Sequence, residues 1–291
     1  MKRGCLALTA LLWLTGCAAP TPYRTISLRF DGPAATELGN DSDELRIAQV
    51  VAHLIRERLG LPFPEGTTVR VYVNQATLAA GLVRDGEQVS GEAWDRSRVA
   101  IAVASSRGLF LRGDLVNSMR LMERVGLIAH ELAHVSQMEM GRGGRRAPAY
   151  WIGEGHADWV KYQVLELLGM RTYPESREEV KRTILRATTP IRFFPPLGDL
   201  TSSDRWMDAS IRLGSAPTYG QAFLAIDMLV ERYGVESLHT YMRRFARDAD
   251  PRSHWRAVFP IDSSEFVRQF RARLEQLGGT APRGMLAAAI R

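Results

Sequence analysis

The chain is poor in cysteine and has no long apolar run. Its two cysteines, Cys5 and Cys17, both lie close to the N-terminus. Its one apolar stretch lies within residues 1–17, and it is far shorter than the about 20 residues that a transmembrane helix needs. The sequence also shows no internal repeat and no low-complexity block. These features exclude a multi-pass membrane protein, a fibrous or collagen-like chain and a wholly disordered one.

The rest of the composition is that of a globular protein. The 291 residues are 45% hydrophobic and 24% charged, which is enough for one large domain or two modest ones. The net charge is +6, but the 38 Lys and Arg residues are spread along the chain rather than gathered in blocks. This distribution favours a solvated basic surface over a nucleic-acid-binding stripe, so we expect no nucleic-acid partner.

Residues 1–16 have the pattern of a secretory signal peptide, with Lys2 and Arg3 before an apolar segment. The segment ends in Leu-Thr-Gly-Cys17, which resembles the lipobox of bacterial lipoproteins. That resemblance implies that Cys17 is acylated, becomes the first mature residue and anchors the protein to a membrane of the bacterial cell envelope. In a Gram-negative host it implies the outer membrane, facing the periplasm. The alternative is an ordinary signal peptide with an incidental cysteine.

Loss of Cys5 with the signal peptide and acylation of Cys17 would leave no thiol for a disulfide or for a thiolate metal site. The stability of the mature chain must then come from a packed core, for which it is long enough. We expect a short tether at 17–25, one domain at 26–278 and a mobile tail at 279–291.

The order of elements predicts an α+β fold. Apolar patterns indicate strands at 26–30, 67–73 and 99–104 and helices at 40–59, 115–140, 151–168, 219–233, 235–247 and 263–276. Asp41 or Ser42 should cap the first helix, and Gly141 should end the helix at 115–140. The proline-containing segment 187–216 predicts an irregular connector that packs over the surface. Residues 26–140 would form a mixed N-terminal lobe, and residues 141–278 an all-helical C-terminal lobe.

The motif that carries chemistry is His130-Glu131-Leu-Ala-His134, an H-E-x-x-H sequence within a predicted helix. Residues four apart lie about 40° around a helix and about 6 Å along it, so both imidazoles can reach one ion. Glu131 lies beside them, where it could contact a metal-bound water without being a ligand. The apolar residues between the two histidines favour a buried helix over a solvated one.

A third ligand comes from the next predicted helix, where Glu154 lies in the sequence Trp-Ile-Gly-Glu-Gly-His-Ala-Asp. Two histidines and one carboxylate, with a fourth position left for water, form the open ligand set of catalytic zinc. His156 should point elsewhere on the helix, so a structural role is favoured for it. His239 could stabilise an oxyanion, but its neighbours favour a packed helix face.

These motifs resemble the gluzincin metallopeptidases, particularly the peptidase MA-like group related to thermolysin. The similarity covers roughly residues 65–275 and includes Tyr219-Gly-Gln-Ala-Phe, Tyr233-Gly and the segment from Trp255 to Phe266. It implies a zincin-like fold, with the active-site helix in the N-terminal lobe and a cleft between the lobes. The G-x-M-E-N signature of the large aminopeptidase branch and the third histidine of metzincins are absent, which leaves the substrate class open.

Carried over residue by residue, the resemblance implies one Zn²⁺ held by His130, His134 and Glu154. It implies Glu131 as the base that activates a zinc-bound water and then donates a proton, and Tyr219 as the residue that stabilises the oxyanion. Asp158 would accept a hydrogen bond from a ligand imidazole, most readily that of His130. The strand at 99–104 would hold an extended peptide by β-augmentation.

The resulting hypothesis is a membrane-anchored zinc metallopeptidase that acts on peptides or proteins of the cell envelope. One alternative is an envelope assembly or binding lipoprotein that uses a metallopeptidase fold with little turnover. The intact Glu131 argues against this, because a non-catalytic site has no chemical need for that base. The other is an amidase that acts on cell-wall peptides, although the sequence has no recognisable wall-binding module.

Overall fold

The computed structural model describes residues 23–31, 37–85, 88–247 and 250–279. The predicted signal peptide, the acylation site Cys17, the start of the tether and residues 280–291 lie outside the described residues, and the predictions made for them stay predictions. In chain order the strands are β1 (Tyr23–Ser27), β2 (Thr68–Tyr72), β3 (Ala102–Ser105) and β4 (Gly108–Arg112). The helices are α1 (Glu44–Leu59), α2 (Gln75–Arg84), α3 (Ser90–Val99), α4 (Gly113–Val116), α5 (Leu121–Met140), α6 (Tyr150–Leu167), α7 (Tyr173–Leu185), α8 (Ser203–Leu213), α9 (Ser215–Tyr233), α10 (Val235–Arg243), α11 (Pro251–Arg256) and α12 (Ser263–Gly279).

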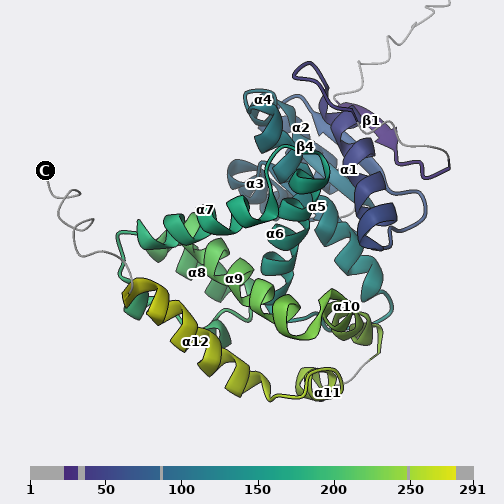
Figure 1. Ribbon diagram of the computed structural model, residues 1–291. Coiled ribbons are helices and arrows are strands. Elements are labelled where there is room, and N and C mark those ends of the chain that lie inside the picture. Colours follow the sequence, from purple (N-terminus) through teal and green to yellow (C-terminus); the bar gives the residue numbers. More distant parts are fainter. Residues whose placement is uncertain (1–22, 32–36, 86–87, 248–249, 280–291) are drawn as a thin grey trace, which may run out of the picture.

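The fold is mixed α+β and mostly helical, as the order of patterns predicted. Its sheet and the first five helices gather in one part of the molecule, the later helices form the other, and α6 lies between them (Figure 1). Among the described residues, no helix combines the length and the apolarity that a membrane-spanning helix requires.

The four strands form one sheet in the order β1-β2-β4-β3. The β1/β2 and β3/β4 pairs are antiparallel, whereas β2 and β4 are parallel. Alternation along the strands supplies both faces of the sheet, because Leu109 and Leu111 enter the main core and Phe110 enters a smaller one with residues of α2 and α3. In the described sheet, β3 pairs only with β4, so its other edge carries no strand, and this strand contacts α5.

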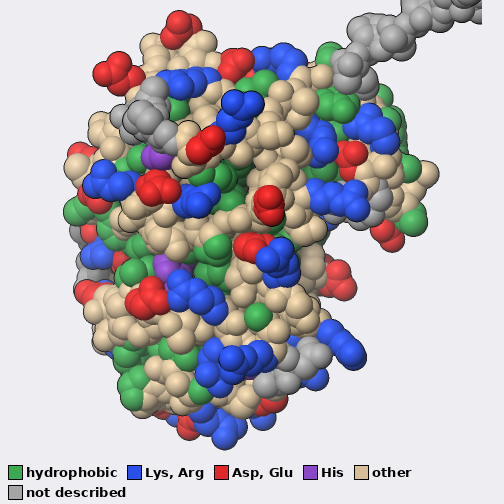
Figure 2. All heavy atoms as spheres, turned by 90° about the vertical axis from the view of Figure 1, so that its right-hand side faces the viewer, with side chains coloured by type: hydrophobic (Ala, Val, Ile, Leu, Met, Phe, Trp, Pro, Cys, Tyr) green, Lys and Arg blue, Asp and Glu red, His purple; other side chains and the backbone are tan. Residues whose placement is uncertain are grey.

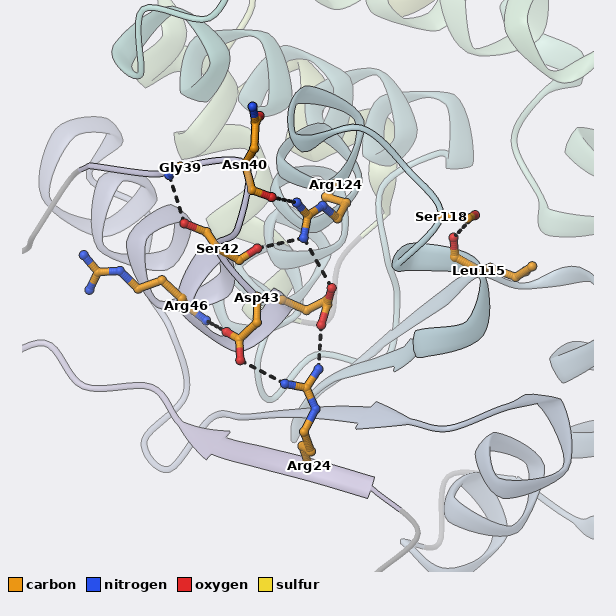
Figure 3. A network of polar contacts seen from close by, with 10 residues as sticks. Arg24, Gly39, Asn40, Ser42, Asp43, Arg46, Leu115, Ser118 and Arg124 are labelled. Carbon is orange, nitrogen blue, oxygen red and sulfur yellow. Dashed lines mark hydrogen bonds and ion pairs between the residues drawn. The ribbon is translucent and has the colours of Figure 1, made fainter.

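A buried charge network fixes α5 to the start of the fold (Figure 3). The Arg124 guanidinium donates to the carbonyls of Ser42 at 2.7 Å and Asn40 at 2.9 Å and lies 3.5 Å from the Glu44 carboxylate. Arg24 of β1 donates to the second oxygen of Glu44 at 2.6 Å. Because Glu44 is 2% exposed, these contacts compensate a charge that burial would otherwise penalise. They hold α5, which carries the H-E-x-x-H motif, in a fixed place.

Helices α5, α6 and α9 pack against one another in that order. Helices α6 and α9 approach closely at Gly155, where a Cβ would lie 2.4 Å from the carbonyl oxygen of Ala222. Only glycine allows the two backbones to approach in this way. The residue before it is Glu154, so the close approach also sets the distance between the proposed third ligand and α9.

The structure corrects several expected boundaries in the N-terminal half. The first strand is Tyr23–Ser27 rather than 26–30, and residues 23–25 of the expected tether belong to it. Helix α1 begins after Asp43, whose carboxylate accepts from the Arg46 N–H, so neither Asp41 nor Ser42 is its cap. The strand expected at 99–104 is Ala102–Ser105, because α3 extends to Val99.

Later elements also differ from their expected bounds. The helix expected at 115–140 is divided into α4 and α5, and Gly141 follows α5 as its C-cap. The expected irregular connector at 187–216 contains α8, whose apolar residues Trp206, Ala209 and Leu213 are buried. Gly279 ends α12 and does not start a tail. The strand at 67–73 and the helix at 151–168 are confirmed to within about one residue.

Candidate metal centre

Helices α5 and α6 bring three predicted ligands together. The Nε2 atoms of His130 and His134 lie 3.2 Å apart. The Glu154 carboxylate oxygen Oε2 is 3.2 Å from the His130 Nε2 and 3.6 Å from the His134 Nε2. Helical spacing places the two imidazoles on one face of α5, and α6 crosses that face at Glu154. This His-His-Glu group could hold a metal ion.

The spacing of these atoms fits a tetrahedral ion. Four bonds of about 2.0–2.1 Å to such an ion give edges of about 3.3–3.4 Å between ligand atoms. The three observed separations of 3.2, 3.2 and 3.6 Å lie on either side of that value. Three protein ligands leave the fourth corner of the tetrahedron for water or substrate, which is typical of catalytic rather than structural sites.

Asp158 lies where the sequence predicted it, behind His130. Its Oδ1 accepts from the His130 Nδ1–H at 3.0 Å and from the Lys161 ammonium at 3.1 Å. Burial opposes ionisation of Asp158, but Lys161 and His130 outweigh it and lower its pKa to about 2. The carboxylate is therefore charged at neutral pH. It fixes the ring of His130 with its Nε2 toward Glu154.

The two predicted histidine ligands lie in a negative environment. Burial favours the neutral form of His130, but its hydrogen bonds with Asp158 and Glu154 outweigh burial and raise its pKa to about 10. The pKa of His134 is raised for the same reason, with Glu154 as the main favourable partner. The pKa of Glu154 falls below its usual range despite burial, because His134 and His130 face it. A pocket that stabilises positive charge suits a cation.

His134 has its own partner on the side away from the other ligands. Its Nδ1–H donates to the Gln137 Oε1 at 3.0 Å, and the Gln137 amide nitrogen donates to the Gly153 carbonyl at 2.9 Å. The same nitrogen lies 3.0 Å from Nδ1 of His156, whose Nε2 lies 3.2 Å from Nε2 of His239. Burial lowers the pKa of His239 to about 4, so it is neutral at pH 7.

Aromatic side chains from three helices line the centre. The Tyr219 ring of α9 lies 5.8 Å from the His130 ring and 5.0 Å from the Trp206 ring, measured between centroids. Tyr150 hydrogen-bonds with Glu154, and burial together with that carboxylate raises its pKa to about 12. Burial, followed by the charge of Glu154, also raises the pKa of Tyr219. Both phenols keep their protons at neutral pH and can donate hydrogen bonds.

Glu131 is half-buried on α5, directly after His130. It does not belong to the converging ligand group. Its charge is close enough to contribute to the raised pKa of Tyr219, after burial, Glu154 and Tyr150. A carboxylate outside the ligand group is not needed to hold the ion, which leaves it available for proton transfer.

Comparisons of the chain with protein-family models, curated proteins and solved structures found no match. The assignment of the centre therefore depends on its own geometry, and the resemblance to gluzincins stays a prediction.

The sequence predicted the residues that converge, and Asp158 beside them, but not the other residues that support them. Gln137, Tyr150 and Lys161 were missed, although each lies three or four residues from a predicted ligand or from Asp158. On a helix that spacing places two side chains on the same face, so it is the signal that could have found them. His239 was expected to pack on a helix face, and it is buried against His156.

Proposed function

We propose that this protein is a zinc-dependent metallopeptidase of the H-E-x-x-H…E type. The observation that carries the proposal is the set of three ligand atoms at tetrahedral spacing, from His130, His134 and Glu154, with Glu131 next to them. Two imidazoles and one carboxylate suit Zn²⁺, whereas Mg²⁺ and Ca²⁺ prefer oxygen ligands alone. When bound, the ion supplies a Lewis acid for a carbonyl and lowers the pKa of a water molecule.

Side chains of the protein would transfer the proton, stabilise the oxyanion and orient a ligand. Glu131 takes a proton from the attacking water and passes it to the leaving amine, which needs one carboxylate that alternates between two protonation states. Tyr219 donates its phenolic hydrogen to the oxyanion that develops on the substrate carbonyl. Its raised pKa keeps that hydrogen in place at neutral pH. Asp158 holds His130 in the orientation and tautomer that a ligand needs.

The substrate is proposed to be an extended peptide that pairs with β3. One edge of this strand carries no partner strand in the described sheet, and β3 contacts α5. Main-chain hydrogen bonds along such an edge bind a peptide without demanding a particular sequence. The proposal also includes a zincin-like fold with a cleft between an N-terminal and a C-terminal lobe.

The proposed location is the bacterial cell envelope, with Cys17 as the lipid anchor. The support for it is the lipobox-like sequence before Cys17 and the absence of any other cysteine after residue 5. On the face in Figure 2, basic side chains are scattered and acidic side chains lie between many of them. That distribution agrees with a solvated surface and with the proposal that no nucleic acid is bound.

The test is cleavage of a diverse peptide library by the zinc-loaded full-length protein, read by mass spectrometry. We expect Glu131→Gln to keep zinc and to lose about 10²–10⁴-fold in rate. His134→Ala should lose the zinc itself. Zinc bound by a wild-type protein that cuts no peptide would refute the peptidase and favour the envelope-binding alternative. Products from cell-wall peptides alone would favour the amidase.

A further inference from the structure

A chain of hydrogen bonds leads from the predicted ligand His134 through three helices. It starts at the His134 Nδ1 on α5, continues through the Gln137 side chain and reaches the buried His156 on α6 and His239 on α10. His156 is fully buried, and His239 is 2% exposed. Buried polar groups of this kind must satisfy one another, so the position of each proton depends on its neighbours.

One carbonyl oxygen sets which atoms donate and which accept along this series of hydrogen bonds. The Gly153 carbonyl lies 2.9 Å from the Gln137 amide, and a carbonyl oxygen can only accept. The NH₂ end of the amide must therefore face Gly153, and its oxygen must face the His134 Nδ1. Since that oxygen also can only accept, the His134 Nδ1 must carry the proton. Its Nε2 is then left with a lone pair directed at the ligand group.

The donor and acceptor roles of His156 and His239 follow in the same way. The second N–H of the Gln137 amide faces the His156 Nδ1, which therefore accepts. His156 then carries its proton on Nε2 and donates it to the His239 Nε2 at 3.2 Å. A reversed amide would break the contact to Gly153, whereas the two histidines could keep theirs by exchanging tautomers. The Gly153 carbonyl alone therefore sets the orientation of the amide.

We propose that Gln137 is a positioning residue that fixes the metal-binding tautomer of His134, and that the Gly153 carbonyl fixes the orientation of its amide. The inference rests on the proposed metal site, and it does not require that the site cleaves peptides. His156 and His239 extend the chain of hydrogen bonds beyond the amide and take the tautomers that it sets. An amide oriented by the Gly153 carbonyl leaves His134 a single tautomer.

The experiment compares full-length variants by zinc affinity in a chelator competition and by the ¹H-¹⁵N NMR signal of the His134 Nδ1–H in the zinc-loaded protein. Gln137→Leu removes the acceptor, whereas Gln137→Glu keeps an acceptor oxygen. Gln269→Leu is the control, since this half-buried glutamine hydrogen-bonds on α12. We expect Gln137→Leu to weaken zinc binding about 10–100-fold and to expose the Nδ1 proton to exchange with water. Gln137→Glu should lose less of both, because its carboxylate still accepts from the His134 Nδ1–H although it cannot donate to the Gly153 carbonyl or the His156 Nδ1.

His239→Leu tests the far end of the chain. It should weaken zinc binding less than Gln137→Leu does, because the Gly153 carbonyl still holds the amide. Wild-type zinc affinity in Gln137→Leu, or a loss in Gln137→Glu as large as in Gln137→Leu, would overturn the inference. A wild-type protein that binds no zinc would overturn it together with the metal centre. Zinc binding with the expected variant pattern but without peptide cleavage would overturn the peptidase alone.

Discussion

Replacement of Gly155 by alanine should destabilise the protein, although alanine is the better helix former. The new Cβ would lie 2.4 Å from the carbonyl oxygen of Ala222 and 2.7 Å from its carbonyl carbon. These are backbone atoms of α9, which cannot rotate away as the end of a side chain can. Overpacking of this kind costs about 1–3 kcal/mol, and the helix propensity of alanine returns about 1 kcal/mol. We expect a net loss of up to about 2 kcal/mol in the free energy of unfolding.

Gly126 on α5 offers a matched control for this substitution. A Cβ at that position would lie 3.6–3.8 Å from aliphatic carbons of Lys161, which is ordinary van der Waals contact. Gly126→Ala should therefore stabilise the protein by up to about 1 kcal/mol, through helix propensity alone. The same chemical change is thus expected to have opposite signs on two neighbouring helices.

The assay is urea unfolding of both variants and the wild-type protein, with midpoints compared at a common slope. Displacement of α9 also moves Tyr219, so Gly155→Ala should reduce peptide cleavage by more than its loss of stability explains. A Gly155→Ala variant as stable as Gly126→Ala would refute the reasoning, because it would show that the two backbones separate without cost.

Two further predictions concern the polar groups around the centre. Asp158→Asn keeps an acceptor for His130 but removes the charge, so zinc affinity in a chelator competition should fall about 10–100-fold, and unchanged affinity would contradict the assigned role. Burial lowers the pKa of His239 from 6.5 to about 4, so the stabilisation from its neutral form is complete above pH 6.5 and is lost as the pH falls through about 4. The difference amounts to about 3 kcal/mol. Urea unfolding at about pH 7 and about pH 4.5 should show how much of the free energy of unfolding is lost on acidification. That loss should be smaller in His239→Gln than in wild type or in the control His53→Gln. Parallel losses in all three proteins would show that His239 does not carry this effect.

Features that the residues of a single helix or strand determine were predictable from the sequence. Features that depend on contacts with a neighbouring helix or loop were not. The helix with His130 and His134 and the helix with Glu154 were predicted because their apolar residues repeat at helical spacing. Helix α3 was missed because only two of its residues, Ala93 and Ser97, are buried, which leaves a weak apolar pattern. Helix α8 was missed because the prolines before it suggested a loop, although its buried residues Trp206, Ala209 and Leu213 repeat at helical spacing.

The same distinction holds within the centre. His130 and His134 converge as predicted, because their spacing on one helix is a local property. Glu154 also converges as predicted, but it reaches them from a second helix, and no local spacing fixes that contact. The close approach of α6 and α9 at Gly155 depends on the path of two backbones, which the sequence does not display. The role of Gln137 depends on the Gly153 carbonyl, and no side-chain pattern marks a carbonyl.

At the proposed metal site, the two carboxylates that flank His130 would make metal uptake an exchange of a proton for the metal ion. With Asp158 on one ring nitrogen and Glu154 on the other, this imidazole holds a second proton up to about pH 10. An ion that binds to Nε2 would have to displace that proton, so the apparent affinity of the proposed site should fall as the pH falls. The occupancy of the site would then follow the acidity of its surroundings, while the carboxylate of Asp158, with a pKa of about 2, keeps the ring in place.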